Sequence, residues 1–233
     1  MTSSIPVVTT RTAEGSALQA VLLDMDGTLV DTEGIWWDAE VSIFAELGHA
    51  LAEEYREVVV GGPMTRSASF LIEATGADIA LAELTGLLNS RFTELIDGTV
   101  PMLPGAHRLL TELVAHGIPT ALVSASHRRV MDRVLRSLGE EHFTLTVAGD
   151  EIARTKPYPD PYLFAAAGLA ADPARCVVVE DTATGVRAAE AAGCQVVAVP
   201  SVVAIEPAAR RTVVGSLEEV DLPFLQALVT GMH

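Results

Sequence analysis

Five short runs of aliphatic residues limit the folds that this chain of 233 residues can adopt. The runs occupy residues 19–24, 119–124, 143–148, 176–181 and 195–199, with a weaker sixth run at 212–214. Continuous apolar runs of this length are typical of strands that are buried on both faces of a sheet. Apolar residues at helical spacing separate the later runs, as in 106–114 and 130–138. Strands that alternate with helices predict an α/β fold with a mostly parallel sheet.

The stretch between the first two runs breaks this alternation. It contains roughly 95 residues, far more than one crossover helix requires, and its apolar residues follow a helical period. The spacing predicts three helices, at residues 34–48, 65–76 and 79–97. We therefore expect an inserted all-helical subdomain. The predicted parts of the chain are a mobile N-terminal extension at 1–16, a core formed by 17–32 and 101–233, and the inserted subdomain at 33–100.

The composition narrows the possible partners. The chain has 31 acidic and 15 basic residues, which give a net charge of -16. A field of this sign repels phosphate backbones and anionic lipids, so we expect no nucleic-acid or membrane partner. An anionic substrate would then have to be bound by a positively charged group within the binding site. The two cysteines are too few for a disulfide framework and predict buried thiols in a reducing cytoplasm.

Polar residues follow the ends of the predicted strands. They are Asp24 and Asp26 after the first strand, Ser124 after the second, Lys156 after the third, and Glu180 and Asp181 at the fourth. Each residue alone also fits a turn, a helix cap or a solvated strand end. The carboxyl ends of parallel strands share one edge of the sheet, where ligands bind. Together these residues therefore predict a single site.

The lysine of this set is unusual for the chain. Fourteen of the fifteen basic residues are arginine, and Lys156 is the only lysine in the sequence. A coding bias towards arginine would explain the other fourteen basic residues. The position where lysine persists is then either a functional site or a lysine retained by chance. A compact ammonium fits between a carboxylate and a phosphoryl oxygen better than a planar guanidinium does.

Clustered carboxylates at neutral pH require a compensating cation. Oxygen ligands favour Mg²⁺, and Asp24 and Asp181 are the expected carboxylate ligands. The other oxygen of Asp24 is then free to act as a nucleophile that forms an aspartyl-phosphate. Asp26 lies two residues further on, and we expect its side chain to turn away from Asp24 while its backbone carbonyl can face the metal. The Asp26 carboxyl can give a proton to the leaving oxygen and later take one from water.

The remaining residues suit a phosphate group. Ser124, Ala125 and the amides of Gly27 and Thr28 are expected to donate hydrogen bonds to phosphoryl oxygens. Lys156 would neutralise charge between the phosphate and Asp24. The predicted chemistry is therefore phosphoryl transfer.

Four segments of the chain resemble the motifs of one family. DMDGT, LVSAS, KPYPD and VVVED look like the four motifs of the haloacid dehalogenase-like superfamily, in the branch of phosphatases and β-phosphoglucomutase-like enzymes with a helical cap. The resemblance spans about residues 19 to 200 in the expected order. It implies a Rossmann-like core, bound Mg²⁺ and a cis peptide bond between Lys156 and Pro157. The roles that it implies are nucleophile for Asp24, general acid and base for Asp26, phosphate contacts for Ser124 and Lys156, and a place in the metal site for Glu180 and Asp181.

The expected activity is hydrolysis of a small phosphate monoester, with a phosphosugar mutase as the alternative. A mutase must grip a bisphosphate, which calls for cations in the cap. Residues 33–100 contain only three basic residues, and of these Arg66 alone lies in a loop-like stretch, GGPMTRS, that resembles the substrate-specificity loop of the family. Where the mutases carry a histidine this chain has Trp36, which forms either core packing or an apolar wall for the substrate.

Other classes of protein fit less well. A receiver-type signalling domain also groups aspartates, a hydroxyl and a lysine, but it is shorter and lacks the helical insertion. A P-loop kinase is excluded because the chain has no G-x-x-x-x-G-K-[ST] string. A catalytically idle interaction protein would be expected to have lost one of the reactive residues, and this chain retains all of them. The sequence leaves the identity of the small phosphorylated metabolite and the oligomeric state open.

Overall fold

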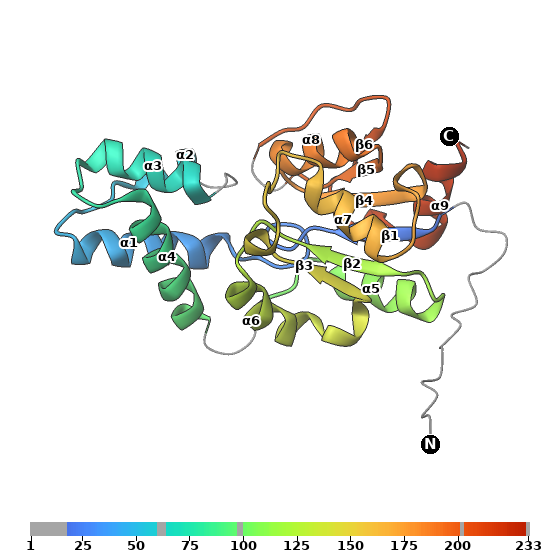
Figure 1. Ribbon diagram of the computed structural model, residues 1–233, viewed down its shortest axis with the longest axis horizontal. Helices are drawn as coiled ribbons and strands as arrows, with labels where there is room; N and C mark the ends of the chain where they lie inside the picture. Colours follow the sequence, from blue (N-terminus) through green and yellow to red (C-terminus); the bar gives the residue numbers. More distant parts are fainter. Residues whose placement is uncertain (1–17, 60–63, 97–99, 201–202, 232–233) are drawn as a thin grey trace, which may run out of the picture.

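The computed structural model describes residues 18–59, 64–96, 100–200 and 203–231. Its centre is a six-stranded sheet in the order β3-β2-β1-β4-β5-β6, in which all neighbouring strands are parallel (Figure 1). The strands are β1 (Ala20–Leu23), β2 (Thr120–Val123), β3 (Leu145–Val147), β4 (Cys176–Glu180), β5 (Gln195–Ala198) and β6 (Arg211–Val213). All six predicted strands are confirmed, including the weak sixth run, and with them the α/β fold. The expected N-terminal extension at 1–16 lies outside the described residues.

Helices cover both faces of this sheet. Those of one face are α5 (Ala106–Ala115), α6 (Arg128–Leu138) and α9 (Leu222–Thr230), and those of the other are α7 (Asp160–Gly168) and α8 (Ala183–Ala192). Successive strand residues point to opposite faces, so Val21 packs with the first group and Leu22 with the second. Every residue of β1, β2 and β4 is buried, as their apolar runs predict, and this includes Thr120 and Glu180 at the strand ends. The chain also has short 3₁₀ turns at Glu140–His142, Gly149–Glu151, Pro173–Arg175 and Leu217–Glu219.

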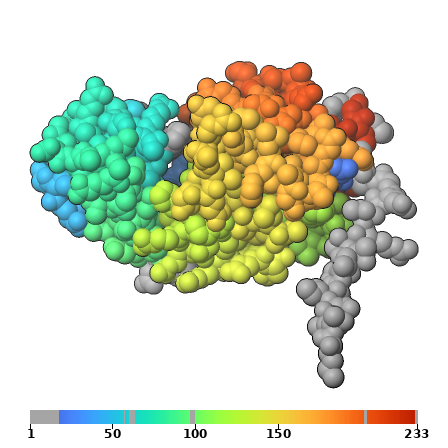
Figure 2. All heavy atoms as spheres, in the orientation of Figure 1, coloured from blue at the N-terminus to red at the C-terminus, as the bar shows by residue number. Residues whose placement is uncertain are grey.

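Among the described residues between β1 and α5, the chain forms four helices. They are α1 (Glu33–Glu46), α2 (Glu53–Val59), α3 (Met64–Thr75) and α4 (Leu81–Leu95). They form a lobe beside the sheet, and the atoms of this lobe face those of the core across a recess (Figures 1 and 2). The ring of Trp36 stacks on Phe92 of α4 with the centroids 3.8 Å apart, which fixes α1 against α4. The three predicted helices are confirmed to within two residues, whereas α2 was not predicted.

The two connections to this lobe lie side by side. Val30 and Met102 form an antiparallel bridge, the amide of Asp31 donates to the carbonyl of Pro101 at 3.0 Å, and the amide of Leu103 donates to the carbonyl of Leu29 at 2.9 Å. The chain therefore leaves the core and returns to it through one short paired stem.

The two cysteines are free and buried, as expected. Burial raises the pKa of each thiol to about 12. In the part of the chain that the structure describes, no helix is both long and apolar enough to cross a membrane.

Candidate active site

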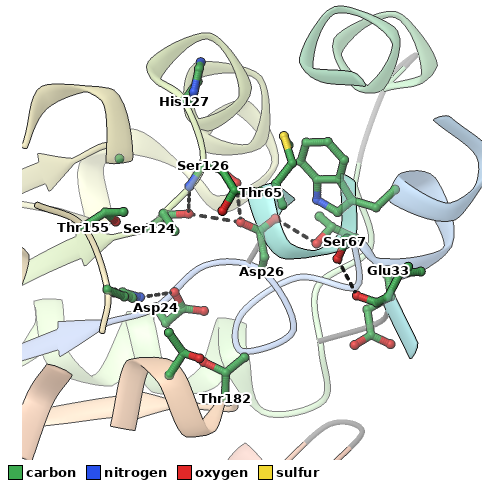
Figure 3. Close-up of a pocket in the computed structure, with 18 of the residues that line it drawn as sticks. Asp24, Asp26, Glu33, Thr65, Ser67, Ser124, Ser126, His127, Thr155 and Thr182 are labelled. Carbon is green, nitrogen blue, oxygen red and sulfur yellow. Dashed lines mark hydrogen bonds and ion pairs between the residues drawn. The ribbon is translucent and has the colours of Figure 1, made fainter. Parts of the chain in front are cut away.

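The polar strand ends meet in one cavity of about 340 Å³, which lies between the core and the helical lobe. From the core it is lined by Asp24, Asp26, Ser124, Ala125, Lys156, Glu180 and Asp181, among others. Figure 3 shows Asp24 and Asp26 side by side on the loop after β1, with Ser124 and Ser126 facing Asp26. These seven residues are all among the predicted site residues, so the structure brings most of the predicted set together.

Lys156 is the cation at the centre of the site. Its Nζ donates to Asp24 Oδ1 at 2.5 Å, to Glu180 Oε1 at 2.8 Å and to the carbonyl of Val123 at 2.9 Å. All three donor positions of the ammonium are therefore used, and the side chain is only 5% exposed. The Lys156–Pro157 peptide bond is cis, as the family resemblance implies.

The buried carboxylates around Lys156 outnumber the buried cations. Asp24, Glu180 and Asp181 are all buried, and each offers an oxygen within 4.8 Å of the others, whereas Lys156 is the only buried cation among the described residues. Burial raises the pKa of Asp24 well above its usual value. The ammonium of Lys156 lowers this pKa, but burial and the neighbouring carboxylates together outweigh it. Burial lowers the pKa of Lys156, but Asp24 and Glu180 outweigh it and hold the lysine charged.

A divalent metal ion fits this donor set. Three buried carboxylates against one ammonium leave an excess of negative charge that a second cation would offset. Hard oxygen donors of this kind suit Mg²⁺, which is commonly held by one or two carboxylates together with water and substrate phosphate. Asp24 and Asp181 are the residues best placed to hold such an ion, because the carboxylate of Glu180 is engaged elsewhere.

The carboxylate of Glu180 accepts hydrogen bonds from three residues in different parts of the chain. Oε1 accepts from Lys156 Nζ at 2.8 Å and from the hydroxyl of Tyr162 at 3.0 Å, and Oε2 accepts from the amide and the hydroxyl of Thr182, both at 3.0 Å. A Cβ at Gly185 would lie 1.5 Å from Oε1, so α8 can approach this carboxylate only because residue 185 is glycine. Glu180 therefore positions Lys156, and its role as a metal ligand stays a prediction.

Asp26 lies in a separate network of hydroxyl groups. Its Oδ1 accepts from Thr32 Oγ1 at 2.8 Å, and its Oδ2 accepts from Ser124 Oγ at 3.1 Å and from Ser126 Oγ at 2.8 Å. These bonds turn the side chain away from the Asp24 and Lys156 pair. Three hydroxyl donors fix the orientation of this carboxyl at the edge of the cavity.

Gly27 and Thr28 occupy different places from those expected of phosphate contacts. Gly27 has a φ of 77°, a left-handed conformation that favours glycine, and its amide donates to the carbonyl of Val30 at 2.9 Å. The hydroxyl of Thr28 donates to Asp181 Oδ1 at 3.2 Å. Neither residue is among those that line the cavity, so in this conformation both shape the loop and support Asp181.

The helical lobe supplies the opposite wall of the cavity. Trp36, Trp37 and Glu40 come from α1, and Thr85 and Asn89 come from α4. Val59, Met64, Thr65 and Ser67 complete this wall. Trp36 therefore lies both on the cavity and in the packing of the lobe. Arg66 lies in the first turn of α3 rather than in a loop, and its side chain is exposed and outside the cavity lining.

Several residues of the site were not predicted from the sequence. Ser126 and Thr32 hold Asp26, Tyr162 holds Glu180, and the buried hydroxyl of Thr155 lines the cavity without a hydrogen-bond partner. Ser126 follows Ser124 at a spacing of two, which places both on one side of an extended chain and could have been recognised. Glu40 interrupts an apolar helical stripe, which also makes it recognisable from the sequence.

Comparison with known proteins identifies the family. Residues 21–199 match the family described as haloacid dehalogenase-like hydrolase. The bifunctional riboflavin kinase/FMN phosphatase of Arabidopsis thaliana is 37% identical over 186 residues, which are 78% of this chain and 48% of that protein. The chain thus spans about half the length of this relative. Protein CbbY of Rhodobacter capsulatus is 33% identical over 195 residues, which are 79% of this chain and 86% of that protein.

A solved structure of a relative has the same fold. A crystal structure of a mutant of CbbY from Rhodobacter sphaeroides in complex with xylulose-(1,5)bisphosphate matches with a TM-score of 0.78 and 28% identity, and it covers 89% of this chain and 99% of that one. The family match extends over most of the described chain and includes all four polar strand ends. The chain therefore belongs to the haloacid dehalogenase-like hydrolase family.

Proposed function

We propose that this protein is a phosphatase that hydrolyses a small phosphate monoester through an aspartyl-phosphate on Asp24. The observation that supports this most directly is the pairing of two differently held carboxyl groups in one cavity. Asp24 is bound by the ammonium of Lys156, and Asp26 is held by the hydroxyls of Thr32, Ser124 and Ser126. Two carboxyl groups in such unlike surroundings suit two roles, a nucleophile and a general acid and base.

In the first step the free oxygen of Asp24 attacks the phosphorus atom. The bond between phosphorus and the leaving oxygen breaks, and the protonated carboxyl of Asp26 transfers its proton to that oxygen, so the alcohol departs neutral. Lys156 offsets negative charge on the phosphoryl oxygens and keeps Asp24 oriented. The unpartnered hydroxyl of Thr155 is available as a further donor to the phosphate, whereas the hydroxyl of Ser124 already donates to Asp26.

In the second step water attacks the phosphorus of the aspartyl-phosphate. The Asp26 carboxylate, now deprotonated, takes a proton from this water as the bond to Asp24 breaks and inorganic phosphate leaves. Both carboxyl groups return to their starting states, so the cycle balances. Bound Mg²⁺, held by Asp24 and Asp181, would supply positive charge to the phosphoryl oxygens during these steps.

Residues 33–100 form the cap of this enzyme in our proposal, and their charge favours hydrolysis over the mutase alternative. Two arginines of the cap are paired with glutamates outside the cavity, Arg56 with Glu53 at 3.3 Å and Arg91 with Glu46 at 2.7 Å. A mutase would have to hold a second phosphate against this wall, and no described residue of the wall is a cation.

The test is a phosphate-release screen with purified protein, Mg²⁺ and a panel of small phosphorylated metabolites. The proposal predicts release of inorganic phosphate from at least one monoester, and release should stop in the Asp24→Asn variant. Conversion of β-glucose 1-phosphate into glucose 6-phosphate, with a bisphosphate required in catalytic amounts, would instead support the mutase. Failure of the wild-type protein to release phosphate from any monoester would refute the proposal.

A further inference from the structure

We propose that Tyr162 is a positioning residue for the reaction, because its hydroxyl group holds the ammonium of Lys156 in place through the carboxylate of Glu180. This inference rests on the proposed phosphatase function and adds to it a residue that has no contact with the substrate. Tyr162 belongs to α7, its side chain is fully buried, and it is not among the described residues that line the cavity.

The hydroxyl of Tyr162 and the ammonium of Lys156 share one oxygen atom. Glu180 Oε1 accepts from the hydroxyl at 3.0 Å and from Lys156 Nζ at 2.8 Å, and Nζ lies 5.1 Å from the centre of the Tyr162 ring. The tyrosine therefore helps to fix Oε1, and Oε1 helps to fix the ammonium. Because the same ammonium donates to Asp24 Oδ1, a shift of Oε1 would also change the contact that orients the proposed nucleophile.

The carboxylate of Glu180 is fully engaged by its donors. An ionised carboxylate offers about four acceptor sites. Two donors reach Oε1, from Lys156 and Tyr162, and two reach Oε2, both from Thr182. Without the tyrosine hydroxyl, Oε1 would keep a free acceptor site, and the ammonium would no longer have one fixed position beside it.

The hydroxyl group of Tyr162 requires an explanation that packing does not give. The ring lies among apolar residues of one face of the sheet, where phenylalanine would fill the same volume without a polar atom. Burial, together with the negative charge of Glu180, raises the pKa of Tyr162 well above its ordinary value, so the phenol keeps its proton and donates. The bond to Oε1 thus accounts for tyrosine at this position.

The segment between Lys156 and Tyr162 restrains the two residues relative to each other. Three of its five residues are proline, whose ring restricts the backbone angle φ. The segment leads directly into α7, which packs on β1, β2 and β3. A stiff connection of this kind links the place of the buried tyrosine to that of the lysine before it.

The test measures turnover and the state of the lysine in the same variants, with Mg²⁺ present throughout. Tyr162→Phe removes the hydroxyl group and keeps the ring. Tyr158→Phe is the matched control, because it makes the same change in a tyrosine that is 51% exposed and lies four residues earlier in the chain. Glu180→Gln alters the group through which Tyr162 is proposed to act and keeps its shape.

The kinetic measurement uses 4-nitrophenyl phosphate and the best monoester found in the screen. Tyr162→Phe should lower kcat at least tenfold and leave KM within threefold of the wild-type value, because only the reacting groups lose their alignment. Tyr158→Phe should change neither constant. If Tyr162 acts through Glu180, adding Tyr162→Phe to Glu180→Gln should lower kcat by no more than about threefold further.

The sequence offers a second readout that does not depend on turnover. Lys156 is the only lysine of the chain, so protein labelled with ¹⁵N-lysine should give a single side-chain ammonium signal by nuclear magnetic resonance. Tyr162→Phe should shift or broaden this signal, whereas Tyr158→Phe should leave it unchanged. Circular dichroism checks the fold of each variant. If Tyr162→Phe did not fold, Glu180→Gln should still show the loss of kcat and the change in the signal.

Three results would overturn the inference while leaving the phosphatase intact. They are a kcat for folded Tyr162→Phe within threefold of the wild-type value, an unchanged lysine signal in that variant, and a tenfold or greater further loss of kcat when Tyr162→Phe is added to Glu180→Gln. If the wild-type protein released phosphate from neither 4-nitrophenyl phosphate nor any monoester of the screen, the proposed function itself would be refuted and the positioning role with it.

Discussion

Replacing Glu40 by glutamine should change how the stability of the protein depends on pH. In the folded chain burial raises the pKa of Glu40 to about 8, against an ordinary value of 4.5. Above pH 4.5 the unfolded chain therefore releases a proton that the folded chain keeps. The contribution of this proton to stability is complete below pH 4.5 and is lost progressively as the pH rises to about 8. Glutamine has no such proton to lose.

The size of the effect follows from the difference between the two pKa values. At 1.36 kcal/mol per pH unit, the native state at pH 7 carries a penalty of about 3 kcal/mol relative to pH 4.5. Glu40→Gln should therefore gain stability over the wild-type protein as the pH rises, by less than about 1 kcal/mol at pH 5 and by about 3 kcal/mol at pH 7. The wild-type protein and Glu40→Gln share all the other ionisable groups that line the cavity or adjoin Glu40, including Asp24, Asp26, Lys156 and Glu33. The contributions of these groups therefore cancel, to first order, in the difference in stability between the two proteins.

The assay is urea unfolding at several pH values between 5 and 8, followed by tryptophan fluorescence. Trp36 and Trp37 are the only tryptophans of the chain and both lie on α1 with Glu40, so the fluorescence reports on the relevant helix. Asp38→Asn is the matched control, because its exposed side chain meets water in both states. If the difference between Glu40→Gln and the wild-type protein stayed constant within about 0.5 kcal/mol across this range, the proposed retention of a proton by buried Glu40 would be refuted.

Further variants test the reactive residues and the metal. Asp24→Asn should remove turnover while leaving the fold intact by circular dichroism, and near-normal activity would exclude the covalent mechanism. Chelation by EDTA should stop phosphate release and added Mg²⁺ should restore it, whereas full activity in thorough chelation would exclude the metal. Lys156→Arg should lower kcat/KM by about 10²-fold or more, because a guanidinium cannot occupy the ammonium position between two carboxylates and a carbonyl. A loss of only a few-fold would show that a positive charge alone suffices at this position. Ser126→Ala should lower kcat more than it changes KM, because it removes one of the hydrogen bonds that orient the Asp26 carboxyl. An unchanged kcat would show that Ser126 does not position Asp26.

The sequence predicted the sheet well because its strands are buried on both faces. The run 176–179 is apolar at every position, and few arrangements other than a central parallel strand satisfy it. Helix α7 was missed for a related reason. Its Ala165 and Ala166 are buried, but the segment from Leu163 to Gly168 is apolar or small all round and leaves no helical period to recognise.

The site was predictable to the extent that it follows strand ends. Asp24, Ser124, Lys156 and Asp181 come directly after strands or in the loops beyond them, so the topology alone brings them together. The place of Arg66 could not be predicted in this way, because the direction of a side chain on a helix depends on where the helix packs. The engagement of the Gly27 amide within its own loop likewise required coordinates.

The paired stem between Leu29–Asp31 and Pro101–Leu103 has a consequence for what the core can tolerate. In the folding of the core, the inserted segment between these two stretches acts as a single loop. The ends of this loop are held together by hydrogen bonds. The entropic cost of closing a loop grows only with the logarithm of its length, by about 0.6 kcal/mol for each doubling. Exchanging the enclosed segment for one of different length and sequence should therefore disturb the folding of the sheet little. The segment that we propose to select the substrate can thus diverge while the proposed reactive residues, which lie at the ends of the strands, keep their places.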